Sequence, residues 1–192
     1  MVSNFQVKQW SDARLFLDEA RGFLSAREDV NAVILGISQN ISRSDSPDNS
    51  DNFFALAYEG EKPVAAAFRT PPHGVALTQG PDEAMVLLAD TVHERYDELP
   101  GANGPQAAVN AFSKRIASMT GQQIKVRFEM RIHRLDAVEP LILPNGLLRR
   151  AQPKDRDLLH QWMTEFSNIT LDKDGPTMDE VEALLAKPDP RF

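Results

Sequence analysis

The sequence predicts an α/β protein in which a central block of strands is covered by helices. Three observations lead to this prediction. Residues 53–80 hold three short apolar segments separated by polar breaks with glycine and proline, which is typical of consecutive antiparallel strands. Apolar residues recur at helical spacing on both sides of this block. Residues 122–135 alternate apolar and polar side chains, which predicts a long strand with one buried and one solvated face.

The segment before the strand block predicts a strand, two helices and a loop. We expect a short strand over residues 5–9 and a helix that begins at Ser11 or Asp12, since both side chains can accept hydrogen bonds from free amides. A second helix is expected from Glu28 to about Ile41. Its apolar side is expected to carry Val30, Val33, Ile34 and Ile37. Residues 42–52 are nearly all turn-forming and predict a surface loop.

After the strand block, two helices are expected before the long strand. The first runs from Asp82 to about Glu98, and its acidic first turn suits the positive end of the helix dipole. The second begins at Pro105 and is closed by Gly121. Residues 101–104 are too short and glycine-rich to predict a strand from the residues alone.

The pattern starts again after residue 136. A short strand is expected over residues 147–151, and a helix that opens at Pro153 and Asp155 carries an apolar face of Leu158, Leu159, Trp162 and Phe166. Thr177 and Glu180 have capping-box spacing, with a helix to about Ala186. We therefore predict a first domain over 1–136, a linker over 137–146, and the beginning of an incomplete second domain over 147–192, which is shorter than an independent domain.

Composition excludes several classes of function. The chain has 192 residues, a net charge of −7 and no run of lysine and arginine, which argues against a nucleic-acid or anionic membrane surface. It has no cysteine, so disulfides and thiolate chemistry are excluded. No two histidines have metal-ligand spacing, so no metal site is expected. The N-terminus lacks a signal pattern and no apolar run is long enough to span a bilayer, which predicts a cytoplasmic protein.

Several segments resemble the N-terminal half of bacterial tandem GNAT acyltransferases. The predicted order of strands and helices matches the layout of that fold, which has a mixed, mostly antiparallel sheet flanked by helices. The stretches that carry the resemblance are Ala65-Ala66-Ala67-Phe68-Arg69-Thr70-Pro71-Pro72-His73, Leu99-Pro100-Gly101-Ala102-Asn103-Gly104-Pro105, Arg131-Ile132-His133-Arg134-Leu135 and Leu148-Arg149-Arg150-Ala151 with Asp155, Leu158, Leu159 and Trp162. Together they cover most of the chain, from about Phe5 to about Phe166.

The resemblance implies an N-acetyltransferase that moves an acetyl group from acetyl-coenzyme A to a small-molecule or peptide amine. The family binds the coenzyme pyrophosphate at a glycine-rich loop between a strand and a helix. The corresponding junction here, residues 78–83, has one glycine, no basic residue, two acids and a proline without an N–H, and is a poor anion cradle. This chain is therefore expected to be the N-terminal portion of a truncated enzyme, not competent alone and not binding acetyl-coenzyme A alone. The alternative is a degenerate, non-catalytic GNAT-like module with a structural, association or ligand-sensing role.

The residues of the strand block provide four candidates for a cleft, and no catalytic residue is assigned. Arg69 and His73 border the Pro71-Pro72 turn, with Thr70 between them, and Asn103 lies in the glycine-rich segment. Arg69 and His73 either bind an anion or a partner domain, or Arg69 pairs with a carboxylate while His73 caps a turn; the structural interpretation is favoured. For the segment around Asn103, a tight turn into a helix is favoured over close approach to a ligand. Because a missing half would leave apolar surface exposed, self-association is a further expectation.

Overall fold

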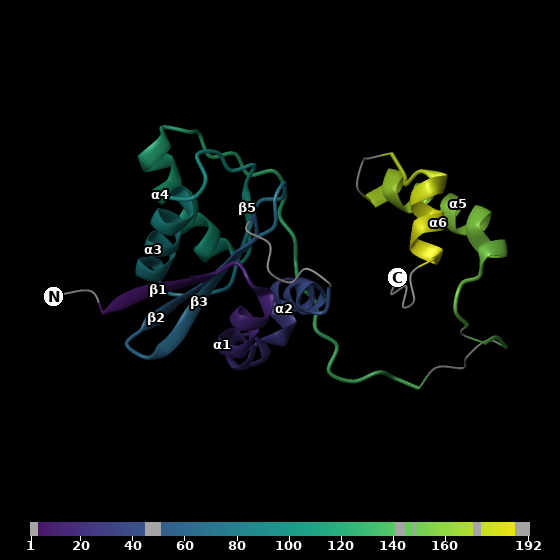
Figure 1. Ribbon diagram of the computed structural model, residues 1–192, viewed down its shortest axis with the longest axis horizontal. Coiled ribbons are helices and arrows are strands. Elements are labelled where there is room, and N and C mark those ends of the chain that lie inside the picture. Colours follow the sequence, from purple (N-terminus) through teal and green to yellow (C-terminus); the bar gives the residue numbers. More distant parts are fainter. Residues whose placement is uncertain (1–3, 45–50, 141–144, 148, 171–173, 187–192) are drawn as a thin grey trace. The chain divides into compact units, whose positions relative to one another are not determined.

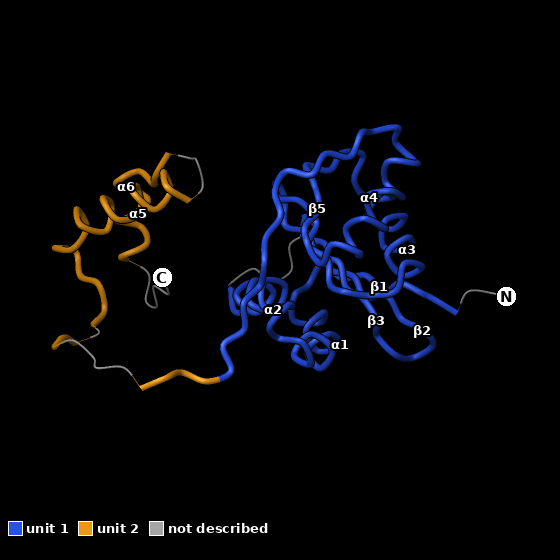
Figure 2. Tube along the Cα trace, turned by 180° about the vertical axis from the view of Figure 1, so that it is seen from behind, with its two compact units in different colours: residues 1–136 blue, residues 137–192 orange. Residues whose placement is uncertain are grey.

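The computed structural model describes residues 4–44, 51–140, 145–147, 149–170 and 174–186. The chain forms two compact units, residues 1–136 and residues 137–192, coloured separately in Figure 2. The first unit is an α/β domain, and the second consists of helices.

The first unit contains a five-stranded mixed sheet in the order β1-β2-β3-β4-β5. Neighbouring strands from β1 to β4 are antiparallel, and β5 lies parallel to β4. The α/β class and the mixed sheet flanked by helices are thus confirmed, as are the opening strand and the three-strand block. The strands are β1 (Phe5–Trp10), β2 (Phe53–Glu59), β3 (Lys62–Arg69), β4 (Val75–Leu77) and β5 (Ala102–Asn103).

Four helices cover the two faces of this sheet: α1 (Ala13–Ser25), α2 (Glu28–Ser42), α3 (Asp82–His93) and α4 (Gln106–Thr120). Side chains from one face of the sheet, including Phe53 and Val75, pack with α3 and α4. Those from the other face, including Phe54 and Leu56, pack with α1 and α2. The three layers are visible in Figure 1, where the helix pairs lie on opposite sides of the strands.

The middle of β3 is a run of three alanines that serves both cores. Ala65 and Ala67 face α3 and α4, whereas Ala66 faces α1 and α2. All three are completely buried. Their small side chains allow both helix layers to approach the centre of the sheet.

Three of the helix ends follow the predicted signals. The Asp12 side chain accepts from the amides of Arg14 and Leu15, at 2.7 and 3.4 Å, and so caps α1. Gly121 ends α4 with a left-handed φ of 73°. Asp82 and Glu83 occupy the first turn of α3, as predicted.

The buried face of α2 differs from the prediction. Val33 is 60% exposed and Ile37 is 38% exposed, whereas Ile34 is buried as expected. The buried face is completed by Asn31, Leu35 and Ser38. The Nδ2 of Asn31 donates to the Leu24 carbonyl oxygen at 3.1 Å, so this amide is satisfied by the end of α1. Contact with α1, which hydropathy does not encode, therefore decides how α2 is rotated about its axis.

Two further predictions for this unit need correction. The helix α3 ends at His93 instead of about Glu98, because the chain turns so that Tyr96 packs edge-on against Phe53, with ring centroids 6.1 Å apart. The predicted strand over 122–135 is not a strand: these residues are extended, exposed and outside the sheet. Alternation specifies two faces, but a strand also needs a neighbour, and no described strand pairs with this segment.

The second unit contains a short 3-10 helix η1 (Pro153–Asp155) and two helices, α5 (Arg156–Thr170) and α6 (Met178–Leu185). The Thr177–Glu180 capping box is present as predicted. Residues 147 and 149–151 form no strand, and Leu148 lies outside the described residues. Arg149 instead makes a two-pronged ion pair with Asp155, with N–O distances of 2.6 and 2.8 Å. This ion pair holds the pKa of Asp155 well below its usual range.

Candidate functional site

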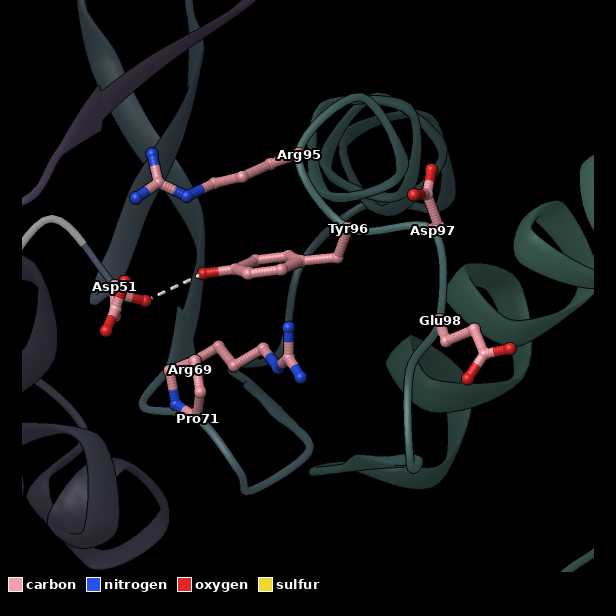
Figure 3. A pocket seen from close by; sticks show the side chains of 7 residues that line it. All are labelled: Asp51, Arg69, Pro71, Arg95, Tyr96, Asp97 and Glu98. Atoms are coloured by element: carbon pink, nitrogen blue, oxygen red, sulfur yellow. Dashed lines mark hydrogen bonds between the residues drawn. The ribbon is translucent and has the colours of Figure 1, made fainter.

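An open pocket of about 490 Å³ lies where the end of β3 meets the connection between α3 and β5. Figure 3 shows the lining side chains, which come from three separate parts of the chain. The lining residues are Asp51, Arg69, Pro71, Arg95, Tyr96, Asp97 and Glu98. Of the four sequence-predicted cleft residues, only Arg69 lines this pocket.

Arg69 is the buried cation of the pocket. It is the last residue of β3 and is 7% exposed. Its Nε donates to the carbonyl oxygen of His73 at 2.9 Å, and its guanidinium carbon lies 3.9 Å from the centre of the Tyr96 ring. The expected pairing of Arg69 with a carboxylate is not present among the described residues; a carbonyl and an aromatic face take its place.

Tyr96 is held both at its hydroxyl group and on its aromatic ring. Its hydroxyl donates to the carbonyl oxygen of Asp51 at 3.0 Å, as the dashed line in Figure 3 shows. The guanidinium carbon of Arg95 lies 5.7 Å from the ring centre, and Arg95 Nη2 donates to the Asn52 carbonyl oxygen at 3.2 Å. The ring therefore lies between two guanidinium groups and ties the start of β2 to the end of α3.

The charge pattern of the pocket is mixed. Two arginines and three acidic residues line it, so it is not a simple anion trap. The side chains nearest the ring form hydrogen bonds to backbone carbonyls, and no described nucleophile is paired with a base there. This arrangement can hold a polar ligand or a neighbouring segment, but it lacks the pairing that nucleophilic catalysis requires.

The other predicted cleft residues have structural positions. The Thr70 carbonyl accepts from the His73 amide at 3.0 Å within the β3–β4 turn, and the His73 side chain is exposed. Asn103 lies on β5, opposite Ala76. The sequence does not predict the roles of Tyr96, Arg95 and Asp51, because a helix to Glu98 and a loop over 42–52 give no sign that these two segments meet.

The glycines around β5 serve the approach of two strands. A Cβ on Gly74 would lie 2.4 Å from the Gly101 carbonyl oxygen, and one on Gly104 would lie 2.5 Å from the Leu77 carbonyl oxygen. The Gly101 oxygen also accepts from the Val75 amide at 2.9 Å. Close packing of backbones explains Gly74 and Gly104, so neither glycine indicates a ligand.

The junction between β4 and α3 is packed and acidic. A Cβ on Gly80 would lie 2.6 Å from Ala65 Cβ and 2.9 Å from both Met85 Cε and the Val64 carbonyl oxygen. Pro81 precedes the first turn of α3 and offers no amide hydrogen or side-chain cap. The glycine therefore fits α3 against β3, and the two carboxylates of the first turn together with the missing Pro81 amide hydrogen make this helix start a poor phosphate site.

A tyrosine elsewhere in the first unit has a perturbed pKa with a structural cause. Burial and a hydrogen bond to Glu19 raise the pKa of Tyr58 to about 12. The Tyr58 hydroxyl donates to Glu19 Oε2 at 3.1 Å, and Lys8 Nζ lies 4.8 Å from the ring centre. A raised pKa makes this phenol a weaker acid that keeps its proton, and the contact serves to join β2 to α1.

Two further properties concern the described part of the chain as a whole. It contains no group of three or more histidine or acidic side chains placed to hold a metal ion. None of its helices combines the length and the apolar character that crossing a bilayer requires.

Comparisons with protein-family models, with curated proteins and with solved structures found no match.

Proposed function

We propose that this chain is the N-terminal portion of a GNAT-like N-acetyltransferase, and that its first unit does not itself bind acetyl-coenzyme A. Support for the family comes from topology. Two helices between β1 and β2, an antiparallel β1–β4 block, a helix before β5 and a helix after it follow the layout that the sequence resembles.

The observation that carries the second half of the proposal is the β4–α3 junction. A coenzyme pyrophosphate needs several free amides and room for its oxygens at such a junction. Gly80 is instead surrounded by Ala65, Val64 and Met85, and the first helical turn carries Asp82 and Glu83. Each of these features opposes binding of a dianionic phosphate group.

In the proposed full reaction, a neutral amine attacks the thioester carbonyl carbon, a base or water chain takes the amine proton, and coenzyme A leaves as the thiol. A hydrogen-bond donor stabilises the oxyanion that forms. We assign neither role to a described residue of this chain. The expectation that residues 147–192 begin a second domain of the same kind stays a prediction.

Isothermal titration calorimetry tests the proposal directly. We expect no saturable heat when acetyl-coenzyme A is added to this chain, and saturable micromolar binding would overturn our interpretation of the β4–α3 junction. The family assignment has a separate test: where the coding frame continues past the Phe192 codon, we expect the longer protein to bind acetyl-coenzyme A. A longer protein that binds no coenzyme would contradict the family assignment.

The second candidate function is a non-catalytic GNAT-like module, and the pocket favours it. The side chains of Arg69, Arg95 and Tyr96 are engaged with neighbouring backbone carbonyls, as expected of a structural clamp. Amine-acetylation assays of the longer protein separate the two candidates. Coenzyme binding with acetyl transfer supports the enzyme, whereas binding without transfer to any amine in a broad panel supports the module.

A further inference from the structure

The segment from Gln122 to Leu135, called the stripe segment below, has a feature that acyl transfer does not explain. Every second residue from Ile124 to Ile132 is apolar. All of these apolar side chains are more than half exposed: Ile124, Val126, Phe128, Met130 and Ile132. A contiguous apolar stripe of this size on an extended segment indicates a binding surface.

The backbone of the stripe segment also lacks a sheet neighbour. No strand in the described part of the chain pairs with it. Figure 1 shows the chain after α4 as an extended trace outside the labelled strands. An extended segment with strand-like alternation and no strand partner among the described residues is a template for pairing with another strand.

The sequence of the stripe is nearly symmetrical about Phe128. Ile124 and Ile132 are the same residue, and Val126 and Met130 are both apolar. When two such segments run antiparallel with Phe128 opposite Phe128, all five apolar residues of each copy face apolar residues of the other. Registers shifted by one residue place the apolar stripe of one copy on the polar face of the other.

Apolar matching selects among the remaining registers, because every other register of this parity places at least one of the five apolar side chains opposite a residue outside the stripe. With Phe128 at the centre, Arg127 of each copy faces Glu129 of the other, which gives two attractive cross-strand pairs. With Glu129 at the centre, glutamate faces glutamate and Arg127 faces Arg131. The Phe128 register also has two repulsive pairs, because Lys125 of each copy faces Arg131 of the other near the ends of the paired region.

We propose that the stripe segment is a homodimerisation strand, which pairs antiparallel with the same segment of a second copy in the register centred on Phe128. The two-fold axis of the dimer passes between the two Phe128 residues. Pairing gives the backbone of each segment a hydrogen-bonding neighbour and places each apolar side chain beside an apolar side chain of the other copy. This inference does not depend on coenzyme binding or acyl transfer.

Cysteine cross-linking tests the register, and the chain has no native cysteine to interfere. In the proposed dimer the two Phe128→Cys residues face each other, at a Cα separation of about 4.5 to 5.5 Å, which a disulfide can bridge. Oxidised glutathione should therefore convert Phe128→Cys to a covalent dimer. Ile124→Cys alone should remain largely uncrosslinked, since its partner is Ile132, and Ile124→Cys with Ile132→Cys should crosslink again.

Charge variants test the same register without covalent bonds, by sedimentation velocity over a range of concentrations. Glu129→Lys replaces two attractive pairs with repulsive ones and should weaken the dimer by roughly 3- to 30-fold. The exchange Arg127→Glu with Glu129→Arg should restore it. Lys125→Glu should strengthen the dimer by a similar factor, because it converts the repulsive end pairs into attractive ones.

These charge predictions also separate specific pairing from non-specific association. The net charge is −7, so Lys125→Glu makes the chain more negative and Glu129→Lys makes it less negative. General charge repulsion would therefore rank the two variants in the opposite order. That opposite ranking, a monomer throughout the soluble range, or equal cross-linking of Phe128→Cys and Ile124→Cys would each overturn the proposal. Because these side chains are exposed in the single chain, the variants should keep the parent circular dichroism spectrum.

Discussion

At the scale of single residues, Arg69 is the most informative side chain. It is nearly buried, and no carboxylate partner for it is present among the described residues. Removing an arginine from water is costly unless its charge and donors are compensated. The ring of Tyr96 and the carbonyl of His73 supply that compensation, so Arg69 stabilises the pocket by joining β3 to the end of α3.

A double-mutant cycle measures this contact. Arg69→Met keeps most of the apolar volume but loses the charge and the donor, and should lower the free energy of unfolding by about 1–3 kcal/mol. Tyr96→Leu removes the ring. In urea unfolding, the two changes should couple by about 0.5–2 kcal/mol. The exposed Arg21, changed to Met, is the control and should have little effect; additive effects at 69 and 96 would contradict the proposed contact.

The Tyr58–Glu19 contact predicts how stability depends on pH. The folded pKa of Tyr58 is raised to about 12, above the ordinary value of 10.0, so the unfolded chain releases this proton first. The resulting stabilisation is complete below pH 10 and is lost as the pH rises towards 12. Tyr58→Phe should cost about 1 kcal/mol at neutral pH.

The matched comparison is the slope of stability against pH. Between pH 10 and 12, urea unfolding should show a steeper loss of stability for the parent chain than for Tyr58→Phe, while Tyr96 is unchanged in both proteins. Parallel slopes would show that Tyr58 ionises equally in the folded and unfolded chains.

Residue-level features were predictable where their cause is local. The cap at Asp12, the left-handed Gly121 and the Thr177–Glu180 box each depend on neighbours within a few residues. The contact of Arg69 with Tyr96 joins segments far apart in the chain. No sequence pattern encodes such a contact, so the pocket could not be predicted beyond Arg69 itself.

At the scale of elements, hydropathy predicted which segments are helices better than which side of each helix is buried. On α2, Asn31 and Ser38 are buried while Val33 is exposed. The reason is packing against α1, where the side chain of Asn31 donates to the Leu24 carbonyl oxygen. The segment over 122–135 shows the same limit for strands, because periodicity describes one strand and pairing requires two.

The β4–α3 junction provides a prediction about packing. Gly80→Ala places a methyl group within 3 Å of β3 and Met85, and should destabilise the protein by about 1–3 kcal/mol through overpacking. Gly36 in α2 has open space at its Cβ position, so Gly36→Ala should stabilise the protein by about 0.5–1 kcal/mol. Thermal unfolding followed by circular dichroism compares the pair, and equal effects would contradict the packed junction.

At the scale of the whole molecule, the two units differ in how much core they contain. The first has apolar clusters on both faces of its sheet. Among the described residues of the second, Val181 is the buried hydrophobic side chain, and Trp162 and Phe166 on α5 are 58% and 61% exposed. The first unit therefore contains the apolar burial that stabilises a fold by itself.

Fragments test this difference. Residues 1–136 expressed alone should unfold cooperatively in urea, with a midpoint close to that of the whole chain. Residues 137–192 alone should show a weak, gradual transition, since little apolar surface is buried there. Loss of cooperative unfolding from the 1–136 fragment would show that the first unit needs the remaining residues.

The alanine run at the centre of β3 also bears on which sequences this fold accepts. Ala65, Ala66 and Ala67 are fully buried between two helix layers. Each added methyl group at these positions has to displace a helix, at a cost of about 1–3 kcal/mol for a well-packed core. Tolerance to substitution should thus be lowest at these three alanines, although their side chains are small. Natural or laboratory substitutions should be accepted more readily on the helices than in the middle of the sheet.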